Sequence, residues 1–238
     1  MSQQGVGRGS DVDFLSYHSG SSGNLYQLKS DSGNILIEAG VTINRIKKAL
    51  EFKLSDISAA LISHEHKDHC KAVSDIARAG ISCYMIAETA KALNFDGHRL
   101  NIIESLKQFE VSGFKILPFP IQHDAPGVGF LISNGVDKLV YATDTFYVRY
   151  KFKGLTMIAI ECNWSKETLA PGLIPIRKQR LYKSHFNLAN VIKFLKANDL
   201  SRVREIHLLH LSRENANGDY FKSEVMKATG KPVYIANS

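Results

Sequence analysis

Short runs rich in apolar and β-branched residues recur along the whole chain and alternate with amphipathic stretches. Such runs are typical of β-strands, and they occupy residues 12–17, 25–28, 34–37, 57–62, 83–86, 101–103, 108–111, 114–119, 129–133, 138–142, 156–160, 206–209 and 233–235. Strands that alternate with helices indicate an α/β fold. We expect 57–86 to form a strand, helix, strand unit and 101–142 to form an antiparallel meander.

Helices are predicted where apolar residues recur at helical spacing. The stripes are Ile43/Ile46/Leu50, Val73/Ile76/Ala77, Leu188/Val191/Ile192/Leu195 and Phe221/Val225/Ala228. Thr42 and Asp219 are suited to cap the first and last of these helices. Gly80 and Gly230 are suited to end the second and the last.

Several predicted strands end in side chains with acid/base or metal-binding chemistry. The run 57–62 precedes His64, 139–142 precedes Asp144, 157–160 precedes Glu161, and 206–209 precedes His210. In layered α/β folds, ligands bind in crevices at the carboxyl ends of strands. We therefore expect these side chains to share one site.

The amino-acid composition indicates the kind of partner and the cellular compartment, but it does not indicate an activity. The chain has 238 residues, of which 44% are hydrophobic, and it carries a net charge of +7, which favours a polyanionic partner. No stretch approaches the ~18 consecutive apolar residues of a membrane span, so we expect a cytoplasmic protein without a membrane partner. The Gly/Ser/Gln-rich start, 1–10, is expected to be disordered. Cys70, Cys83 and Cys162 form no CxxC pair and are expected to be core thiols.

Three histidines and an aspartate are concentrated just after the run 57–62. They are His64, His66, Asp68 and His69, and the last two are expected to open a helix. Neutral imidazoles and carboxylates are ligands for Zn²⁺, and Mn²⁺ also accepts this mixed set. One short motif cannot supply two coordination shells, so later ligands are needed. The candidates that follow β-like runs are His123, Asp144 and His210.

This order of residues resembles the metallo-β-lactamase fold superfamily, whose pattern is HxHxDH, a later His, a later Asp and a final His. Ribonuclease Z and its bacterial DNA-exonuclease-like relatives are the most similar members. The further segments that carry the similarity are SGSSGN at 19–24, HDA at 123–125, SHFN at 184–187 and HLSREN at 210–215. The resemblance implies one domain over 11–238, built as an αββα sandwich in which two mixed β-sheets pack together with helices on the outer faces.

The resemblance also implies roles for individual residues. It implies one divalent metal ion on His64, His66 and His123, a second on Asp68, His69 and His210, and Asp144 as a bridge. His207 is the competing final ligand, and the similarity of the His-Leu-Ser segment favours His210. The implied catalytic groups are Asp68, Glu161 and His185, with Glu161 orienting the imidazole of His185 so that it protonates the leaving oxygen.

Substrate contacts are predicted on two segments. The basic run Arg177, Lys178, Arg180 and Lys183 precedes His185, so its cations are placed to bind flanking phosphates. The loop around Ser21 and Asn24 can offer N–H groups to a phosphate, although the local sequence favours a plain hairpin turn. Together with the implied site, these features predict a two-metal phosphodiesterase that acts on nucleic acid, with Zn²⁺ or Mn²⁺ as cofactor.

Two departures from the resembled family keep other functions open. Relatives usually carry Asp where Glu38 stands, and the long transfer-RNA-binding arm of ribonuclease Z is not recognisable. A cyclic-nucleotide phosphodiesterase would use the same site without a polymer grip. Small-ester, lactam or thioester hydrolases of the same fold need neither His185 nor the cations, and a nucleic-acid-binding module with a decayed centre is the non-enzymatic alternative. A homodimer is expected by resemblance alone.

Overall fold

Residues 12–237, which a computed structural model describes, form two mixed β-sheets of six and seven strands. The prediction of a disordered start at 1–10 falls outside this range. The first sheet contains β1 (Asp13–His18), β2 (Leu25–Ser30), β3 (Gly33–Ile37), β4 (Ile57–Leu61), β5 (Ser82–Met85) and β6 (Leu100–Ile102), in that order. The second contains, in spatial order, β13 (Val233–Ile235), β12 (Glu205–Leu209), β11 (Met157–Glu161), β10 (Lys138–Ala142), β9 (Val128–Ser133), β8 (Phe114–Pro120) and β7 (Phe109–Val111).

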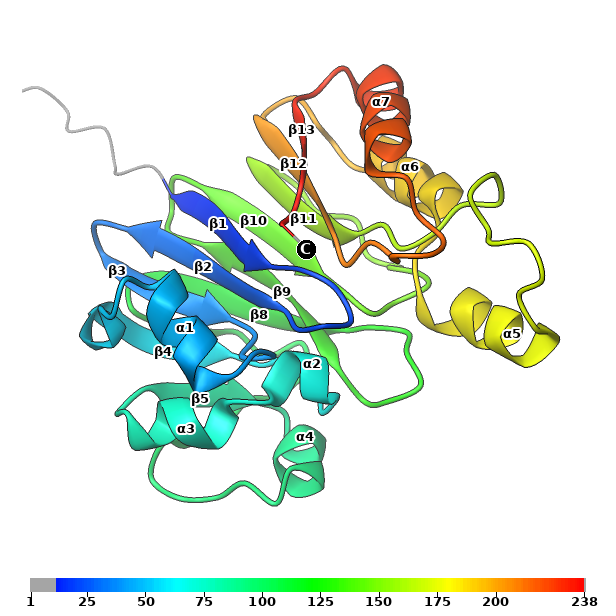
Figure 1. Cartoon of the computed structure of the whole chain (residues 1–238). Helices are drawn as coiled ribbons and strands as arrows, with labels where there is room; N and C mark the ends of the chain where they lie inside the picture. The colour runs from blue at the N-terminus through cyan, green and yellow to red at the C-terminus, as the bar shows by residue number, and fades with distance from the viewer. Residues whose placement is uncertain (1–11, 238) are drawn as a thin grey trace, which may run out of the picture.

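Helices lie on the outer faces of the two sheets (Figure 1). On the side of the first sheet are α1 (Ile43–Ala49), α2 (Lys67–Cys70), α3 (Val73–Arg78) and α4 (Ala87–Ala92). On the side of the second are α6 (Leu188–Ala197) and α7 (Gly218–Thr229). The predicted αββα sandwich is therefore confirmed.

The alternation of apolar side chains explains the layers, because successive residues of a strand face opposite sides of the sheet. Between the sheets, Leu28, Ile37 and Leu61 of the first sheet share one core with Phe130 and Tyr141 of the second. The opposite faces of the sheets pack against the helices in two further cores. Cys70, Cys83 and Cys162 are free and buried in these layers, as predicted.

The topology brings the chemically active strand ends together. β10, β11 and β12 are parallel neighbours, so their carboxyl ends meet at one edge of the second sheet. β4 lies between β3 and β5, parallel to both, and supplies the corresponding end of the first sheet. The predicted strand, helix, strand unit at 57–86 is confirmed by this pairing.

Two local predictions were wrong, and a third is confirmed only in part. Strand β6 pairs in parallel with β5 in the first sheet, so the antiparallel meander starts only at β7. Asn217 caps α7, since its side chain accepts from the backbone N of Tyr220 at 3.0 Å, and Asp219 lies inside the first helical turn. Thr42 occupies the N-cap position of α1, but its side chain makes no capping hydrogen bond.

Helix α5 (Pro175–Ser184) was not predicted, because it carries no apolar stripe. The structure describes every residue of this helix, and Ser184 is the only one of them that is buried. Figure 1 shows that α5 stands apart from the helices that cover the sheets. Within residues 12–237, no helix is long and apolar enough to cross a membrane.

Candidate metal-dependent active site

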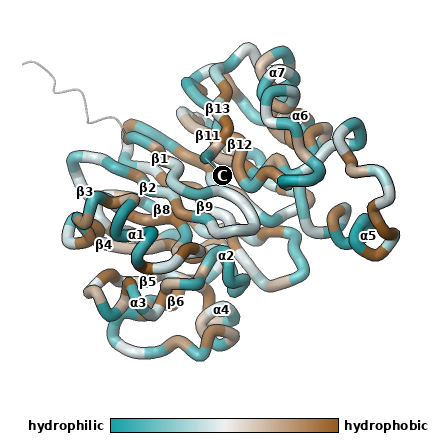
Figure 2. Tube along the Cα trace, viewed as in Figure 1, coloured by the Kyte–Doolittle hydropathy of each residue, from teal (hydrophilic) through white to brown (hydrophobic). Residues whose placement is uncertain are grey.

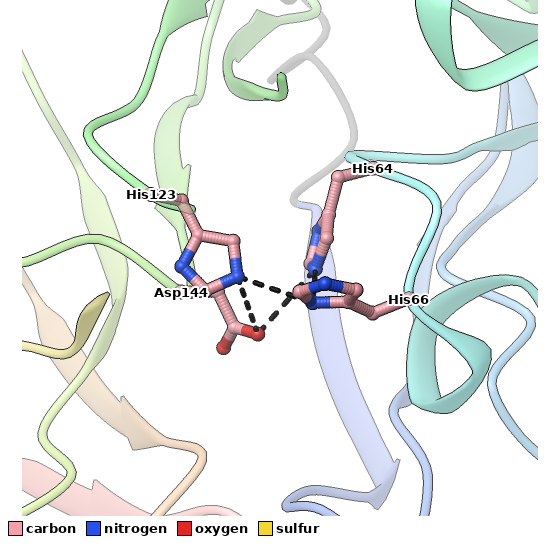
Figure 3. A group of neighbouring side chains, drawn as sticks. All are labelled: His64, His66, His123 and Asp144. Carbon is pink, nitrogen blue, oxygen red and sulfur yellow. Dashed lines mark hydrogen bonds and ion pairs between the residues drawn. The ribbon is translucent and has the colours of Figure 1, made fainter. Parts of the chain in front are cut away.

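Three histidines and one aspartate from both sheets converge in a first cluster. His64 and His66 follow β4, His123 follows β8, and Asp144 follows β10. Nδ1 of His66 lies 3.1 Å from Nε2 of His64 and 3.2 Å from Nε2 of His123. Oδ2 of Asp144 lies 3.4 Å from Nε2 of His64. Figure 3 shows that the four side chains point toward one another.

A second cluster shares Asp144 with the first. Asp68 and His69 come from α2, and His210 follows β12. Nε2 of His69 lies 3.2 Å from Oδ2 of Asp144 and 3.6 Å from Oδ2 of Asp68. The same oxygen of Asp68 is 3.4 Å from Nε2 of His210. Asp144 is therefore the member common to both clusters.

The donor set fits a pair of divalent metal ions. Two donors held ~2.0–2.2 Å from one ion at a tetrahedral angle stand about 3.3–3.6 Å apart, which is close to the separations in both clusters. His64, His69 and Asp144 are buried, so their ring nitrogens and carboxylate oxygens need partners inside the protein, which metal ions would supply. Nitrogen and carboxylate ligands of this kind suit Zn²⁺ and Mn²⁺.

Burial and charge set the protonation of these rings. Burial lowers the pKa of His123 to about 4 and also lowers the pKa of His64. Burial disfavours a proton on His69 as well, but the carboxylates of Asp144 and Glu38 outweigh it and raise the pKa of that ring to about 10. His64 and His123 are thus held in the neutral form that binds metal, whereas a metal ion competes with a proton at His69.

Glu38 stands behind the second cluster. Its Oε1 lies 3.4 Å from Nδ1 of His69 and accepts a hydrogen bond from the hydroxyl of Tyr141 at 3.1 Å. Its Oε2 accepts from the backbone N of Ser63 at 3.3 Å. The carboxylate is fully buried and the backbone φ is 67°, a left-handed conformation. The longer side chain therefore still places a carboxylate beside the ring of His69, where it can orient a metal-binding imidazole.

A buried hydrogen-bond chain supports the same cluster from the loop after β1. The hydroxyl of Ser19 lies 2.6 Å from that of Tyr26, which donates to Oδ1 of Asn24 at 3.0 Å. Nδ2 of Asn24 lies 3.1 Å from Nε2 of His69 and donates to the carbonyl of Asp68 at 3.0 Å. Asn24 is completely buried, so it does not meet substrate as predicted; its side chain holds the α2 segment in place.

A third group of acidic and imidazole side chains lies beside both clusters. It consists of Asp144, Glu161, His185 and His210, and its central contact joins Glu161 to His185. Nδ1 of His185 lies 2.5 Å from Oε1 of Glu161, which is fully buried at the end of β11. Oε2 of Glu161 accepts from the backbone N of Thr145 at 3.0 Å, so the carboxylate is itself fixed. Burial disfavours a proton on His185, but Glu161 outweighs this effect and raises the pKa of the imidazole.

These groups open into one cavity of about 530 Å³. Its lining includes His66, Asp68, His123, Asp144, His185 and His210, together with Ser21, Lys67, Arg177, Arg180 and Leu181. Some of the predicted substrate residues line this cavity and others do not. Ser21, Arg177 and Arg180 line the cavity, whereas Lys178 and Lys183 are exposed on α5 outside its lining.

His207 lies away from both clusters. It is in β12, is buried against the ring of Phe14 and is stacked on Tyr234. Its Nε2 is 3.6 Å from Oε2 of Glu205. The preference for His210 over His207 at the site agrees with this placement.

Sequence reasoning did not single out two residues that contact the site. Asn163 donates to the carbonyl of His210 at 2.7 Å and is buried beside that ring. Asp124 lies with Oδ1 3.0 Å from Nε2 of His123 and Oδ2 3.1 Å from Nη2 of Arg180. The position of Asp124 directly after His123 was the available signal, whereas nothing in the local pattern marks Asn163.

Comparisons with known proteins agree with this geometry. The family described as "Beta-lactamase superfamily domain" matches residues 33–208. The exodeoxyribonuclease WalJ of Streptococcus pneumoniae is 32% identical over 220 residues, covering 83% of this chain and 80% of WalJ. The exodeoxyribonuclease YycJ of Bacillus anthracis is 29% identical over 217 residues, covering 83% of this chain and 81% of YycJ.

A solved structure supports the fold independently. The metallo-beta-lactamase fold protein YhfI from Bacillus subtilis superposes with a TM-score of 0.77 at 16% identity, covering 94% of this chain and 95% of YhfI. Sequence similarity over most of the chain and a shared architecture lead to the same assignment. This chain is a hydrolase that belongs to the metallo-β-lactamase fold superfamily.

Proposed function

We propose that the protein is a two-metal phosphodiesterase that hydrolyses phosphodiester bonds of nucleic acid. The observation that carries the proposal is the bond between His185 and Glu161 beside both candidate metal clusters. Phosphodiester hydrolysis needs charge neutralisation at the phosphate and a proton for the leaving oxygen, and this arrangement offers both at one cavity. The names of the two curated relatives, both exodeoxyribonucleases, support the same class of substrate.

The candidate ligands form two sets with one shared member. His64, His66 and His123 would hold one ion, Asp68, His69 and His210 the other, and Asp144 would serve both. When bound, the ions would supply Lewis-acid activation of water and neutralise negative charge on the phosphate. The protein itself fixes the donors, because each ligand follows a strand or lies in or next to α2, and four of them, His64, His69, Asp144 and His210, are buried.

His185 is assigned the role of general acid. Its Nδ1 is engaged by Glu161, which leaves Nε2 as the nitrogen that carries a proton toward substrate. The carboxylate favours the protonated imidazole, as the raised pKa indicates. The side chain is 20% exposed and lines the cavity, so a leaving oxygen can reach it. General-acid catalysis of this kind contributes ~10²- to 10⁴-fold.

A cyclic mononucleotide is the second candidate substrate. The cavity of about 530 Å³ lies within the ~300–1,000 Å³ usual for small-molecule sites, so it has room for such a ligand. The same site chemistry would hydrolyse either diester. A small-ester, lactam or thioester hydrolase remains the further alternative. Such an enzyme would not need His185 as a proton donor to the leaving group.

A substrate panel with matched variants tests the proposal. Purified protein loaded with Zn²⁺ or Mn²⁺ would be offered linear DNA, RNA and cyclic mononucleotides. Asp68→Ala should abolish hydrolysis by removing a candidate metal ligand, whereas Asp31→Ala, an exposed aspartate in a turn, should match wild type. If wild type and Asp68→Ala were equally inactive on every polynucleotide, the nuclease proposal would fail.

Three further expectations accompany this function. The metal is expected to be Zn²⁺, with Mn²⁺ as the alternative, and elemental analysis of the purified protein would decide between them. The protein is expected to be a cytoplasmic homodimer. Light scattering would give the oligomeric state, and cell fractionation would give the location.

A further inference from the structure

Helix α5 is the most cationic element beside the active-site cavity. Its ten residues, PIRKQRLYKS, include Arg177, Lys178, Arg180 and Lys183 and contain no acidic side chain. All four cations are exposed. Figure 1 shows the helix projecting from the body of the molecule, and Figure 2 shows hydrophilic and hydrophobic positions intermixed along it. Core packing does not explain the four exposed cations, so a different role is needed for them.

The two faces of α5 have different surroundings. Arg177, Arg180 and Leu181 have i, i+3, i+4 spacing and line the cavity. Nη2 of Arg180 lies 3.1 Å from Oδ2 of Asp124, the residue that follows His123. Lys178 lies outside the cavity lining. The cations therefore begin inside the cavity and continue outside it.

The carboxyl end of α5 is tied to the site. The ring of Tyr182 stacks on the buried indole of Trp164, with centroids 4.5 Å apart and planes 14° apart. Nε1 of Trp164 donates to the carbonyl of His185. The carbonyl of Ser184 lies 3.2 Å from Nδ1 of His123, a geometry in which the imidazole donates. The helix is thus attached directly to a candidate ligand and to the candidate general acid.

We propose that α5 binds the sugar–phosphate backbone of a polynucleotide beyond the bond that is cleaved. The inference rests on the proposed phosphodiesterase function and specifies its substrate as a polymer. Arg177 and Arg180 would meet phosphates next to the scissile one, and Lys178 and Lys183 would meet phosphates outside the cavity. The cations at 177, 180 and 183 extend over about 9 Å of helix at 1.5 Å per residue, whereas a cyclic mononucleotide offers a single phosphate for them to bind.

Charge and position favour a polynucleotide over a membrane surface as the occupant. Ile174, at the N-cap of α5, and Ile176, in its first turn, are exposed. Apolar side chains next to cations would suit an anionic bilayer. However, Arg177 and Arg180 face the cavity that holds His185 and the candidate metal ligands. A phosphate chain that enters this cavity meets both arginines together with His185 and the candidate metal ligands, whereas a flat bilayer would contact the exposed helix without entering the cavity.

The test separates polymer binding from chemistry. The variant Lys178→Glu/Lys183→Glu changes exposed cations outside the cavity, and Lys193→Glu/Lys196→Glu makes the same charge change at exposed positions of α6. Binding of a fluorescent 20-nucleotide single-stranded DNA would be measured in chelator over a range of salt. Turnover of bis(p-nitrophenyl) phosphate and of the polymer would be measured with metal.

The α5 variant should bind the DNA at least about tenfold more weakly, with a slope of log K against log salt reduced by about 1.4, which corresponds to ~0.7 for each of two lost phosphate contacts on a single strand. Its turnover of the small diester and the binding of the α6 control should equal wild type. Equal DNA binding by both variants and wild type would overturn the inference. Loss of binding to phosphatidylserine vesicles with DNA binding intact would also overturn it, in favour of a membrane surface. If wild type hydrolysed neither substrate while DNA binding still depended on α5, the phosphodiesterase proposal would fail and the binding role would stand.

Discussion

The hydroxyl of Ser19 accepts a 2.8 Å hydrogen bond from the backbone N–H of His210, although the two residues lie 191 positions apart. The bond joins the loop after β1, in the first sheet, to the end of β12, in the second. His210 has φ 51°, a left-handed conformation that costs energy in a residue with a Cβ. Ser19 therefore acts as a positioning residue that holds a candidate metal ligand in an uncommon backbone conformation.

Replacing Ser19 by Ala should weaken the second metal site selectively. The substitution leaves the buried N–H of His210 without its acceptor, which costs about 1–3 kcal/mol. We expect one of two bound ions to be lost first in a chelator titration followed by elemental analysis. Ser19→Thr, which retains a hydroxyl, should recover the ion, and Ser22→Ala, at an exposed position of the same loop, should resemble wild type. Simultaneous loss of both ions from Ser19→Ala would contradict a selective role.

Replacing Glu38 by Gln tests the carboxylate behind His69. Gln preserves the length of the side chain but removes the charge 3.4 Å from Nδ1 of the imidazole. Loss of such a partner typically reduces metal affinity 10- to 100-fold. Competition with a chelator would measure the affinity, and circular dichroism would verify the fold. Unchanged affinity would show that Glu38 serves packing alone.

Much of this arrangement could be predicted from sequence. Apolar runs that end in His64, Asp144, Glu161 and His210 indicate that a layered α/β fold will collect those side chains, because strand ends of one sheet share an edge. The burial of Asn24 could not be read from its loop. A Gly/Ser segment has the same local pattern whether it meets a phosphate or, as here, supports α2 through Asp68 and His69.

The errors share a physical cause. The partner of β6 is decided by tertiary pairing, and a short apolar run carries no information about the sheet it joins. Helix α5 has no apolar face, so the periodicity that reveals helices is absent from its sequence. Asn163 donates a hydrogen bond to the carbonyl of His210 because the parallel pairing of β11 and β12 brings these residues together. They are 47 positions apart, so no local pattern reveals the contact.

The stability of the fold should depend on Asp137 at neutral pH. Burial disfavours its charge, but hydrogen bonds from the backbone N–H of Val12 and from the guanidinium of Arg204 outweigh burial and lower its pKa. Because this pKa lies below the unfolded value of about 3.9, the stabilisation is complete above that pH and is lost as pH falls through the folded pKa.

Asp137→Asn should therefore lower the free energy of unfolding by about 1–3 kcal/mol at pH 7. The difference from wild type should persist to about pH 5 and shrink below about pH 4. Urea denaturation of metal-free protein would measure it, with the exposed Asp31→Asn as control. A difference that grew as the pH fell would have the wrong sign for this interaction.

Removing single ligands should reveal the shared role of Asp144. Its Oδ2 lies near donors of both clusters, whereas His123 belongs to the first cluster alone, and His210 belongs to the second cluster and to the group around Glu161 and His185. Asp144→Ala should bind close to no metal, and His123→Ala or His210→Ala should retain about one ion per chain. Elemental analysis after metal-supplemented purification gives the stoichiometry. Two ions retained by Asp144→Ala would rule out a bridging role.

The most direct test compares His185→Ala with wild type on two diesters that differ in leaving group. The variant should keep both metal ions, since His185 is placed to donate a proton and is not among the proposed ligands, although it also groups with Asp144, Glu161 and His210. Its turnover of linear DNA should fall ~10²- to 10⁴-fold, while turnover of bis(p-nitrophenyl) phosphate, whose leaving group needs no proton, should fall far less. An equal fall on both substrates, or full activity on DNA, would contradict the assignment of His185 as the general acid of a phosphodiesterase.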